Sequence, residues 1–229
     1  MKFFTVIILL LLIINGVAQN NHIILQEEFN NNNNNWLIEA DQTRILKLNN
    51  GAYSIQNKME YNSVTSRINL PFNENRDFII DCQITKKTGY NKKGYGLIWG
   101  RNKADYYGFY ITGDGEFLVL KWEAGNRDFV VGMQMSEHIM KDDGTNKLSI
   151  QKMGNKQLYF INDSLVQTTD FLPFFGYEIG FANGGKLTME VDYIHVKYIE
   201  EQISKPVITD NIILNETFEN NQKSWPLGK

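Results

Sequence analysis

Closely spaced acidic residues on predicted strands are the side chains best suited to acid–base chemistry. Glu190 and Asp192 are separated by one residue, and Glu39 and Asp41 repeat that spacing. Alternate side chains of a strand point to one face, so either pair can place two carboxylates about 5 Å apart, as a retaining glycosidase requires. A structural or solvated role is the simpler interpretation of both pairs. We therefore assign no catalytic residue and keep Glu190 and Asp192 as candidates to test.

Aromatic side chains offer a second kind of chemistry, the binding of a ligand on a sheet face. In 116–123, alternation separates Phe117 and Lys121 from Trp122. Because charged residues occupy the Phe117 face at positions 121 and 123, we expect that face to be exposed and Trp122 to lie in the core.

In the neighbouring segment 106–112, the continuous apolar set is Tyr107, Phe109 and Ile111, which leaves the alternate residues facing outward. Gly96 and Gly108 can leave room for a ligand, since glycine permits close approach. The predicted ligand-binding residues are Tyr106, Tyr110, Phe117 and Lys121.

Other kinds of site receive little support from the residue pattern. The three histidines are far apart in sequence, the single cysteine rules out an internal disulfide, and neither a serine nucleophile elbow nor a phosphate-binding loop occurs. The net charge of −3 argues against nucleic acid as a partner. Asp142-Asp143-Gly144 lacks the alternating oxygen ligands of a calcium loop and predicts a turn.

The first residues predict export. Lys2 is followed by an apolar run over 3–14 and by the small residues Gly16 and Ala18. This pattern is typical of a cleavable secretory signal over 1–18, and the run is too short to span a bilayer. We expect a secreted, periplasmic or cell-surface protein with no membrane insertion after the signal is removed.

The chain also contains an internal repeat. Residues 23–36 align without a gap to 212–225, with eight identities that include Glu27, Phe29 and Trp36. Between the copies, the polar segment 201–210 with Pro206 predicts a linker. The expected organisation is a signal over 1–18, a domain over 19–200, a linker over 201–210 and the truncated start of a second module over 211–229.

Short alternating or apolar runs separated by Gly, Asn and Asp turns dominate the chain from residue 23 onward. This pattern favours an all-β sandwich or barrel. The expected strands are 23–29, 44–48, 52–56, 64–70, 78–85, 95–100, 107–112, 116–123, 129–133, 147–153, 157–161, 165–169, 177–182 and 186–197.

The order of several segments resembles the concanavalin A-like lectin/glucanase superfamily, especially laminin-G-like modules of secreted bacterial proteins. The segments are Glu28-Phe29 with Trp36, 95–100, 105–111, 113–117 with 121–122, 146–150, 158–162, 180–181 and 191–196. The resemblance implies a two-sheet antiparallel jelly roll that binds sugar or protein, with calcium a possible cofactor. The resemblance also includes glucanases, whose catalytic strand has the pattern Glu-x-Asp-x-x-Glu. Residues 190–195 match the first two acids of this pattern, but His195 stands in place of the last one.

These observations lead to three functional hypotheses. The first is an exported, non-catalytic binding or adhesion module that recognises a glycan or a cell-surface protein and is one repeat of a longer protein. The missing acid and the repeat favour it, since tandem weak modules gain avidity. The second is a glycan-cleaving hydrolase of the glucanase or keto-disaccharide hydrolase type. The third is a structural spacer.

Overall fold

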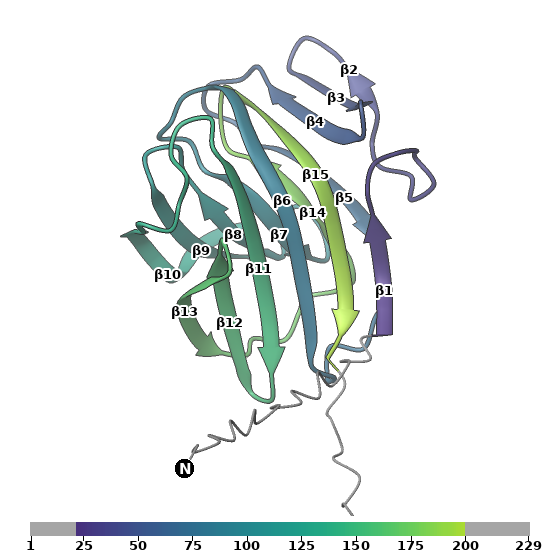
Figure 1. Ribbon diagram of the computed structural model, residues 1–229, viewed down its shortest axis with the longest axis vertical. Helices are drawn as coiled ribbons and strands as arrows, with labels where there is room; N and C mark the ends of the chain where they lie inside the picture. The colour runs from purple at the N-terminus through teal and green to yellow at the C-terminus, as the bar shows by residue number, and fades with distance from the viewer. Residues whose placement is uncertain (1–21, 200–229) are drawn as a thin grey trace, which may run out of the picture.

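The computed structural model describes residues 22–199, which fold into two antiparallel β-sheets packed face to face (Figure 1). Residues 22–199 form fifteen strands and contain no helix, so none of them forms a helix able to span a membrane. The all-β, two-sheet architecture predicted from alternation is confirmed. The expected signal, linker and second module lie outside the described residues, and so do residues 19–21 and residue 200 of the expected domain.

One sheet has nine strands. Its order is β13-β12-β11-β6-β15-β4-β3-β2, and β1 also pairs with β15. The early part of β15 pairs with β4 and its later part with β1, which places His22 opposite Tyr198. The bounds are β1 (His22–Glu27), β2 (Glu39–Ala40), β3 (Arg44–Asn49), β4 (Ala52–Asn57), β6 (Phe78–Gly89), β11 (Thr145–Met153), β12 (Lys156–Ile161), β13 (Ser164–Asp170) and β15 (Leu187–Tyr198).

The other sheet has six strands in the order β10-β9-β8-β7-β14-β5. Its strands are β5 (Val64–Asn69), β7 (Tyr95–Gly100), β8 (Tyr106–Ile111), β9 (Glu116–Glu123), β10 (Asn126–Met135) and β14 (Glu178–Asn183). Each predicted run overlaps one of the observed strands, whereas the two-residue strand β2 is too short to show alternation.

The main core lies between the two sheets and is filled by alternate residues of their strands. On β6, Phe78, Ile80, Cys82 and Ile84 are fully buried, because period-2 geometry directs all four to the inner face. On β8 the inner residues are Tyr107, Phe109 and Ile111, as alternation predicts.

The loop between β1 and β2 is built around the buried carboxylate of Glu27. One oxygen accepts a hydrogen bond from the backbone N–H of Phe29 at 2.7 Å. The other accepts from Asn34 Nδ2 at 2.6 Å and from Trp36 Nε1 at 3.0 Å. Phe29 and Trp36 then pack edge to face in the core with ring centroids 5.4 Å apart. The residues that recur in the internal repeat are thus the ones that hold this loop to the sandwich.

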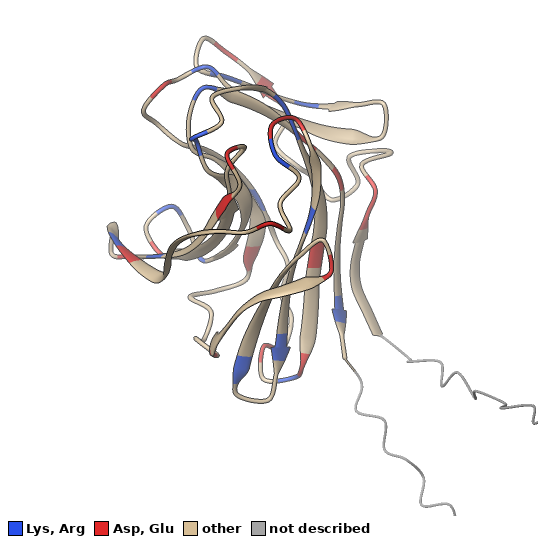
Figure 2. Ribbon diagram, turned by 60° about the vertical axis from the view of Figure 1, so that its left-hand side comes forward, with Lys and Arg blue, Asp and Glu red and all other residues tan. Residues whose placement is uncertain are grey.

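Charged residues of both signs are interspersed over the molecule (Figure 2). This interspersion accords with the small net charge of −3. Any preference for a charged ligand must therefore come from a local arrangement of side chains.

Candidate functional site

The outer face of the six-stranded sheet carries a second apolar cluster, separate from the main core. Its members, called here the outer cluster, are Ile98, Tyr106, Tyr110, Leu118, Leu120, Trp122 and Ala182. They come from β7, β8, β9 and β14 and point away from the nine-stranded sheet, since their sequence neighbours fill the main core. The two predicted binding residues Tyr106 and Tyr110 therefore share one face.

A row of stacked planar groups crosses this face. Tyr106 lies opposite Trp122 in register, and their rings stack with centroids 5.9 Å apart and planes inclined by 11°. The Arg67 guanidinium carbon, on β5, lies 4.9 Å from the centroid of the Tyr106 ring. A cation over an aromatic face is held by the ring quadrupole, so Arg67 is fixed in position by the stack.

Tyr110 fills the space that the sequence analysis left for a ligand. A Cβ atom added at Gly108 would collide with the Tyr110 ring, and one added at Gly96 would collide with the backbone of Phe109. Both glycines are therefore required by packing within the protein. The space that we expected a ligand to occupy is filled by the Tyr110 ring at Gly108 and by the Phe109 backbone at Gly96. Tyr110 is 7% exposed, and burial raises the pKa of its hydroxyl well above the ordinary value.

The structure corrects the predicted faces of β9. Phe117 is 2% exposed in the main core, and Lys121 lies on that same inner side, where its Nζ pairs with Glu123 at 2.9 Å. Trp122 is on the outer face, the reverse of our expectation. The two charges lie near the end of β9, beyond the well-packed middle, so they do not mark which face is buried. The four predicted binding residues are thus divided between opposite faces.

A groove beside the outer cluster is the best candidate for a ligand site. We call it the Arg67 groove; its volume is about 470 Å³. Four separate segments of the chain contribute to it, and the lining residues are Asn35, Leu37, Arg44, Thr65, Ser66, Arg67, Asn102, Lys103 and Glu178. Sequence reasoning missed this site. A signal was present, because alternation along β5 puts Arg67 on the face opposite the core residues Val64 and Ile68.

The Arg67 side chain is 10% exposed and is held by Thr65 of its own strand and by Glu178 of the neighbouring strand β14. Its Nη1 donates a hydrogen bond to Thr65 Oγ1 at 2.7 Å, and its Nε lies 3.7 Å from a Glu178 carboxylate oxygen. Burial lowers the pKa of Arg67, because desolvation disfavours the charged guanidinium. The groove therefore contains a cation held largely away from water.

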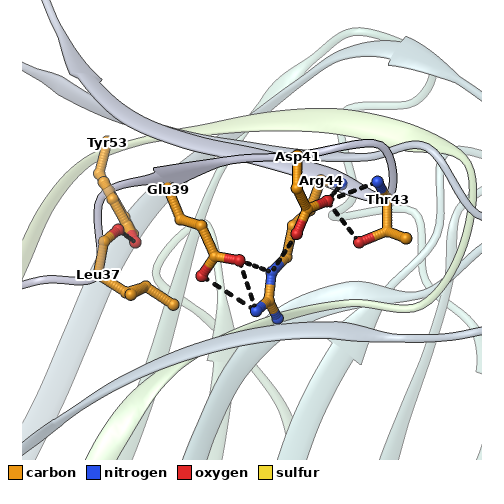
Figure 3. Close-up of polar contacts among 6 residues, drawn as sticks. All are labelled: Leu37, Glu39, Asp41, Thr43, Arg44 and Tyr53. Carbon is orange, nitrogen blue, oxygen red and sulfur yellow. Dashed lines mark hydrogen bonds and ion pairs between the residues drawn. The ribbon is translucent and has the colours of Figure 1, made fainter.

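The wall of the groove formed by residues 37–44 is tied down by polar contacts (Figure 3). Arg44 binds Glu39 through two nitrogens, with a shortest distance of 2.9 Å. Asp41 accepts hydrogen bonds from the Thr43 hydroxyl and backbone, which hold the pKa of its carboxyl far below the ordinary range. Tyr53 donates to the Leu37 carbonyl at 2.6 Å, and burial raises the pKa of Tyr53 to about 12. These contacts connect the wall to strands β3 and β4.

The acidic pairs singled out in the sequence are already engaged in structural contacts. Glu190 lies 3.4 Å from Lys87 Nζ, and Asp192 accepts a 2.7 Å hydrogen bond from Gln83. Neither lines the Arg67 groove. His195, which replaces the last acid of the glucanase pattern, lies 2.6 Å from a Glu28 oxygen on the outer side of the nine-stranded sheet.

A calcium ion, which the resemblance allows, has no carboxylate cluster to bind it in the described part of the chain. No group of three or more His, Cys, Asp or Glu side chains comes together within residues 22–199. The carboxylates of the Asp142–Gly144 turn already have partners in the protein. Asp142 accepts a hydrogen bond from Asn91 Nδ2 at 2.6 Å, and Asp143 lies 3.0 Å from Lys86 Nζ.

Comparisons with known proteins identify the fold. No family model and no curated protein match the sequence. Among solved structures, the chain is similar to the CBM2 module of Lactobacillus casei BL23 phage J-1 evolved Dit (TM-score 0.53, 11% identity, 80% of this chain and 98% of that one).

Two further structures have the same arrangement. One is the carbohydrate recognition domain of Emp47p (TM-score 0.57, 10% identity, 77% of this chain and 95% of that one). The other is the β-glucanase of Bacillus licheniformis (TM-score 0.55, 10% identity, 80% of this chain and 100% of that one). The described chain therefore has the two-sheet antiparallel jelly-roll fold that its resemblance to the concanavalin A-like superfamily implies.

Proposed function

We propose that this protein is a non-catalytic glycan-binding module and that the Arg67 groove is its binding site. The observation that carries the proposal is a rigid polar group set beside stacked aromatic rings: Arg67 lies over Tyr106, which stacks on Trp122. Sugar sites combine apolar surface with a few polar groups that fix the orientation of the ligand. The apolar surface of this groove is Leu37, whereas the buried Tyr106 acts by holding Arg67 in place. The groove offers such polar groups in Asn102, Lys103 and Glu178.

The fold supports this function without choosing between sugar binding and sugar cleavage. The similar structures include a carbohydrate recognition domain and a β-glucanase. Binding is favoured by the environment of the acidic candidates, because Glu190 is paired with Lys87 and Asp192 is bonded to Gln83. A protein partner on a cell surface and a spacer role remain alternative hypotheses.

The proposal includes export and repetition of the module. Both rest on the sequence, namely the signal-like segment 1–18 and the match between 23–36 and 212–225. Several weak sites on one chain would act together, since a second binding event on the same polysaccharide is favoured by its high effective concentration.

The test is a glycan array probed with the purified chain and two matched variants. Lys103→Ala removes an exposed cation of the groove, and Lys92→Ala removes an exposed cation elsewhere. We expect Lys103→Ala to weaken binding about tenfold, the loss of one charge-assisted hydrogen bond, while Lys92→Ala binds like the parent. Thermal unfolding of all three chains checks that the fold is unchanged.

Two results would overturn the proposal. If the parent chain binds no glycan on a broad array, glycan binding is not its function. If it binds and both lysine variants bind equally well, the site lies outside the Arg67 groove. Release of reducing sugar by the parent chain, lost in Glu190→Gln, would instead establish the hydrolase alternative.

A further inference from the structure

The guanidinium of Arg67 is incompletely paired. Nη1 has Thr65 as an acceptor, and Nε faces Glu178 at 3.7 Å, too long for a hydrogen bond. Nη2 is buried and has no hydrogen-bond acceptor within the described part of the chain. The side chain is nonetheless nine-tenths buried. A buried cation with an unfilled donor costs free energy, so its retention in a groove needs a reason.

The other cations of the groove differ in how far they are already neutralised. Arg44 is bound by two nitrogens to Glu39 and also lies 3.8 Å from Asp41. Lys103 is exposed and forms no ion pair with any of the residues 22–199. Among the lining residues, Arg67 and Lys103 thus face the single carboxylate of Glu178. The end of the groove at Arg67 and Lys103 therefore has one more cation than carboxylate, whereas the Arg44 end, with Glu39 and Asp41 behind it, has one more carboxylate than cation.

We propose that the Arg67 groove selects glycans that carry a carboxylate, that is, uronic acid residues. A carboxylate seated beside Lys103 and the exposed part of the Arg67 side chain balances this local excess of charge, while the enclosed Nη2 lies out of its reach. Arginine suits this task better than lysine, because its delocalised charge is weakly hydrated and persists at a desolvated position. The neighbouring Tyr106–Trp122 stack holds the guanidinium in place before the ligand arrives. This inference rests on the proposed glycan-binding function and names the class of glycan.

The experiment compares uronate oligosaccharides with their own carboxyl-reduced forms. Oligogalacturonate, oligoglucuronate and oligomannuronate are each titrated into the purified chain by calorimetry, beside the reduced neutral oligosaccharide with the same linkages. A sulfated neutral oligosaccharide is the third probe. We expect at least one uronate to bind tenfold or more tightly than its reduced form, with an affinity that falls as salt is raised.

Variants then connect the preference to the groove. Arg67→Lys keeps a positive charge but loses its delocalised, weakly hydrated character, so it should reduce the preference for uronate over the reduced form. Lys103→Ala should weaken uronate binding about tenfold and binding of the reduced form by less, because a neutral sugar makes only a hydrogen bond, and no ion pair, with the ammonium. Lys92→Ala is the exposed control, and thermal unfolding shows whether Arg67→Lys still folds.

The possible failures are distinguishable. Equal binding of a uronate and its reduced form overturns the carboxylate preference and leaves glycan binding standing. A preference for the sulfated probe also overturns it, in favour of a sulfate-binding groove. Binding of none of the oligosaccharides, acidic or neutral, counts against the proposed function itself. A carboxylate preference that survives in both Lys103→Ala and Arg67→Lys overturns the assignment to this groove.

Discussion

Glu27 shows how much one buried carboxylate can organise. Its two oxygens accept hydrogen bonds from Phe29, Asn34 and Trp36, and its residue is 4% exposed. Hydrogen bonds to a charged acceptor are stronger than neutral ones, and their removal leaves buried donors without partners. The carboxylate thus links strand β1 to the aromatic residues that enter the core.

We therefore predict that Glu27→Ala lowers the free energy of unfolding by about 3 kcal/mol, the cost of leaving buried donors unsatisfied. The neighbouring Gln26→Ala, at an exposed position on the same strand, should change it by less than about 0.5 kcal/mol. Urea unfolding followed by tryptophan fluorescence measures both. Equal stability of the two variants would show that the loop does not depend on this carboxylate.

Asp81 predicts a specific dependence of stability on pH. Burial raises the pKa of its carboxyl, while His195, Lys147 and Lys197 oppose that shift and Asp163 adds to it. The folded state therefore holds the proton more tightly than the unfolded state. Stability from this group is complete below the ordinary pKa of 3.8 and is lost as pH rises through the raised folded value.

The expected result is that Asp81→Asn, which cannot ionise, removes this loss. Its stability relative to the parent should increase as pH rises above the ordinary pKa of 3.8 and should stay level above the raised folded pKa, because the parent has by then ionised. Urea unfolding at several pH values measures the difference between the two chains. A difference that is constant over that range would mean that Asp81 does not titrate there.

At the scale of the strands, β7, β8 and β9 are covered by side chains on both faces. Gly108 on β8 is needed because the Tyr110 ring occupies the space where a Cβ atom would lie. The two residues are two positions apart on the same strand, so their side chains share the outer face. The packing of the outer cluster is consequently set by pairs of small and large residues.

A double-mutant cycle tests this pairing. Gly108→Ala should destabilise the parent chain by about 1–3 kcal/mol, the usual cost of overpacking, and should cost less when Tyr110 is already Ala. The coupling energy between the two positions is obtained from urea unfolding of the four chains. Additive effects would contradict the packing described for this face.

The positions of the strands could be predicted from the sequence, because alternation is a local property of each strand. The face that β9 buries could not, since Phe117 and Val119 on one side and Leu118 and Leu120 on the other are equally apolar. Only the neighbouring layer decides which set meets the main core. Lys121 and Glu123 misled the prediction because they lie where β9 ends.

The Arg67 groove could not be predicted from the sequence either, because it depends on which segments become neighbours in the fold. Its lining comes from segments around residues 35–44, 65–67, 102–103 and 178, which only the folded sheet brings together. Tyr106 was predicted correctly to face outward, but its burial beneath Arg67 depends on β5, a strand far away in the chain. Local patterns predict elements, whereas a site made of several elements requires their order in the sheet.

At the scale of the whole molecule, the sandwich has separate grooves in different places. The Arg67 groove lies beside the outer cluster, and a separate groove of about 600 Å³ lies between the end of β10 and β13. Phe117 reaches the second groove from the core. The two grooves have no lining residue in common, so each could bind a ligand separately.

His22 and Tyr198 face each other across the β1–β15 pairing, so the chain enters and leaves the sandwich at one place. A short peptide joining these two residues would close the fold into a ring without moving a strand. New ends could then be opened at the turn around Tyr61, which is 84% exposed. Because the two ends lie next to each other, the domain could also be inserted into a surface loop of a host protein. The two ends of the host loop would then stay close together.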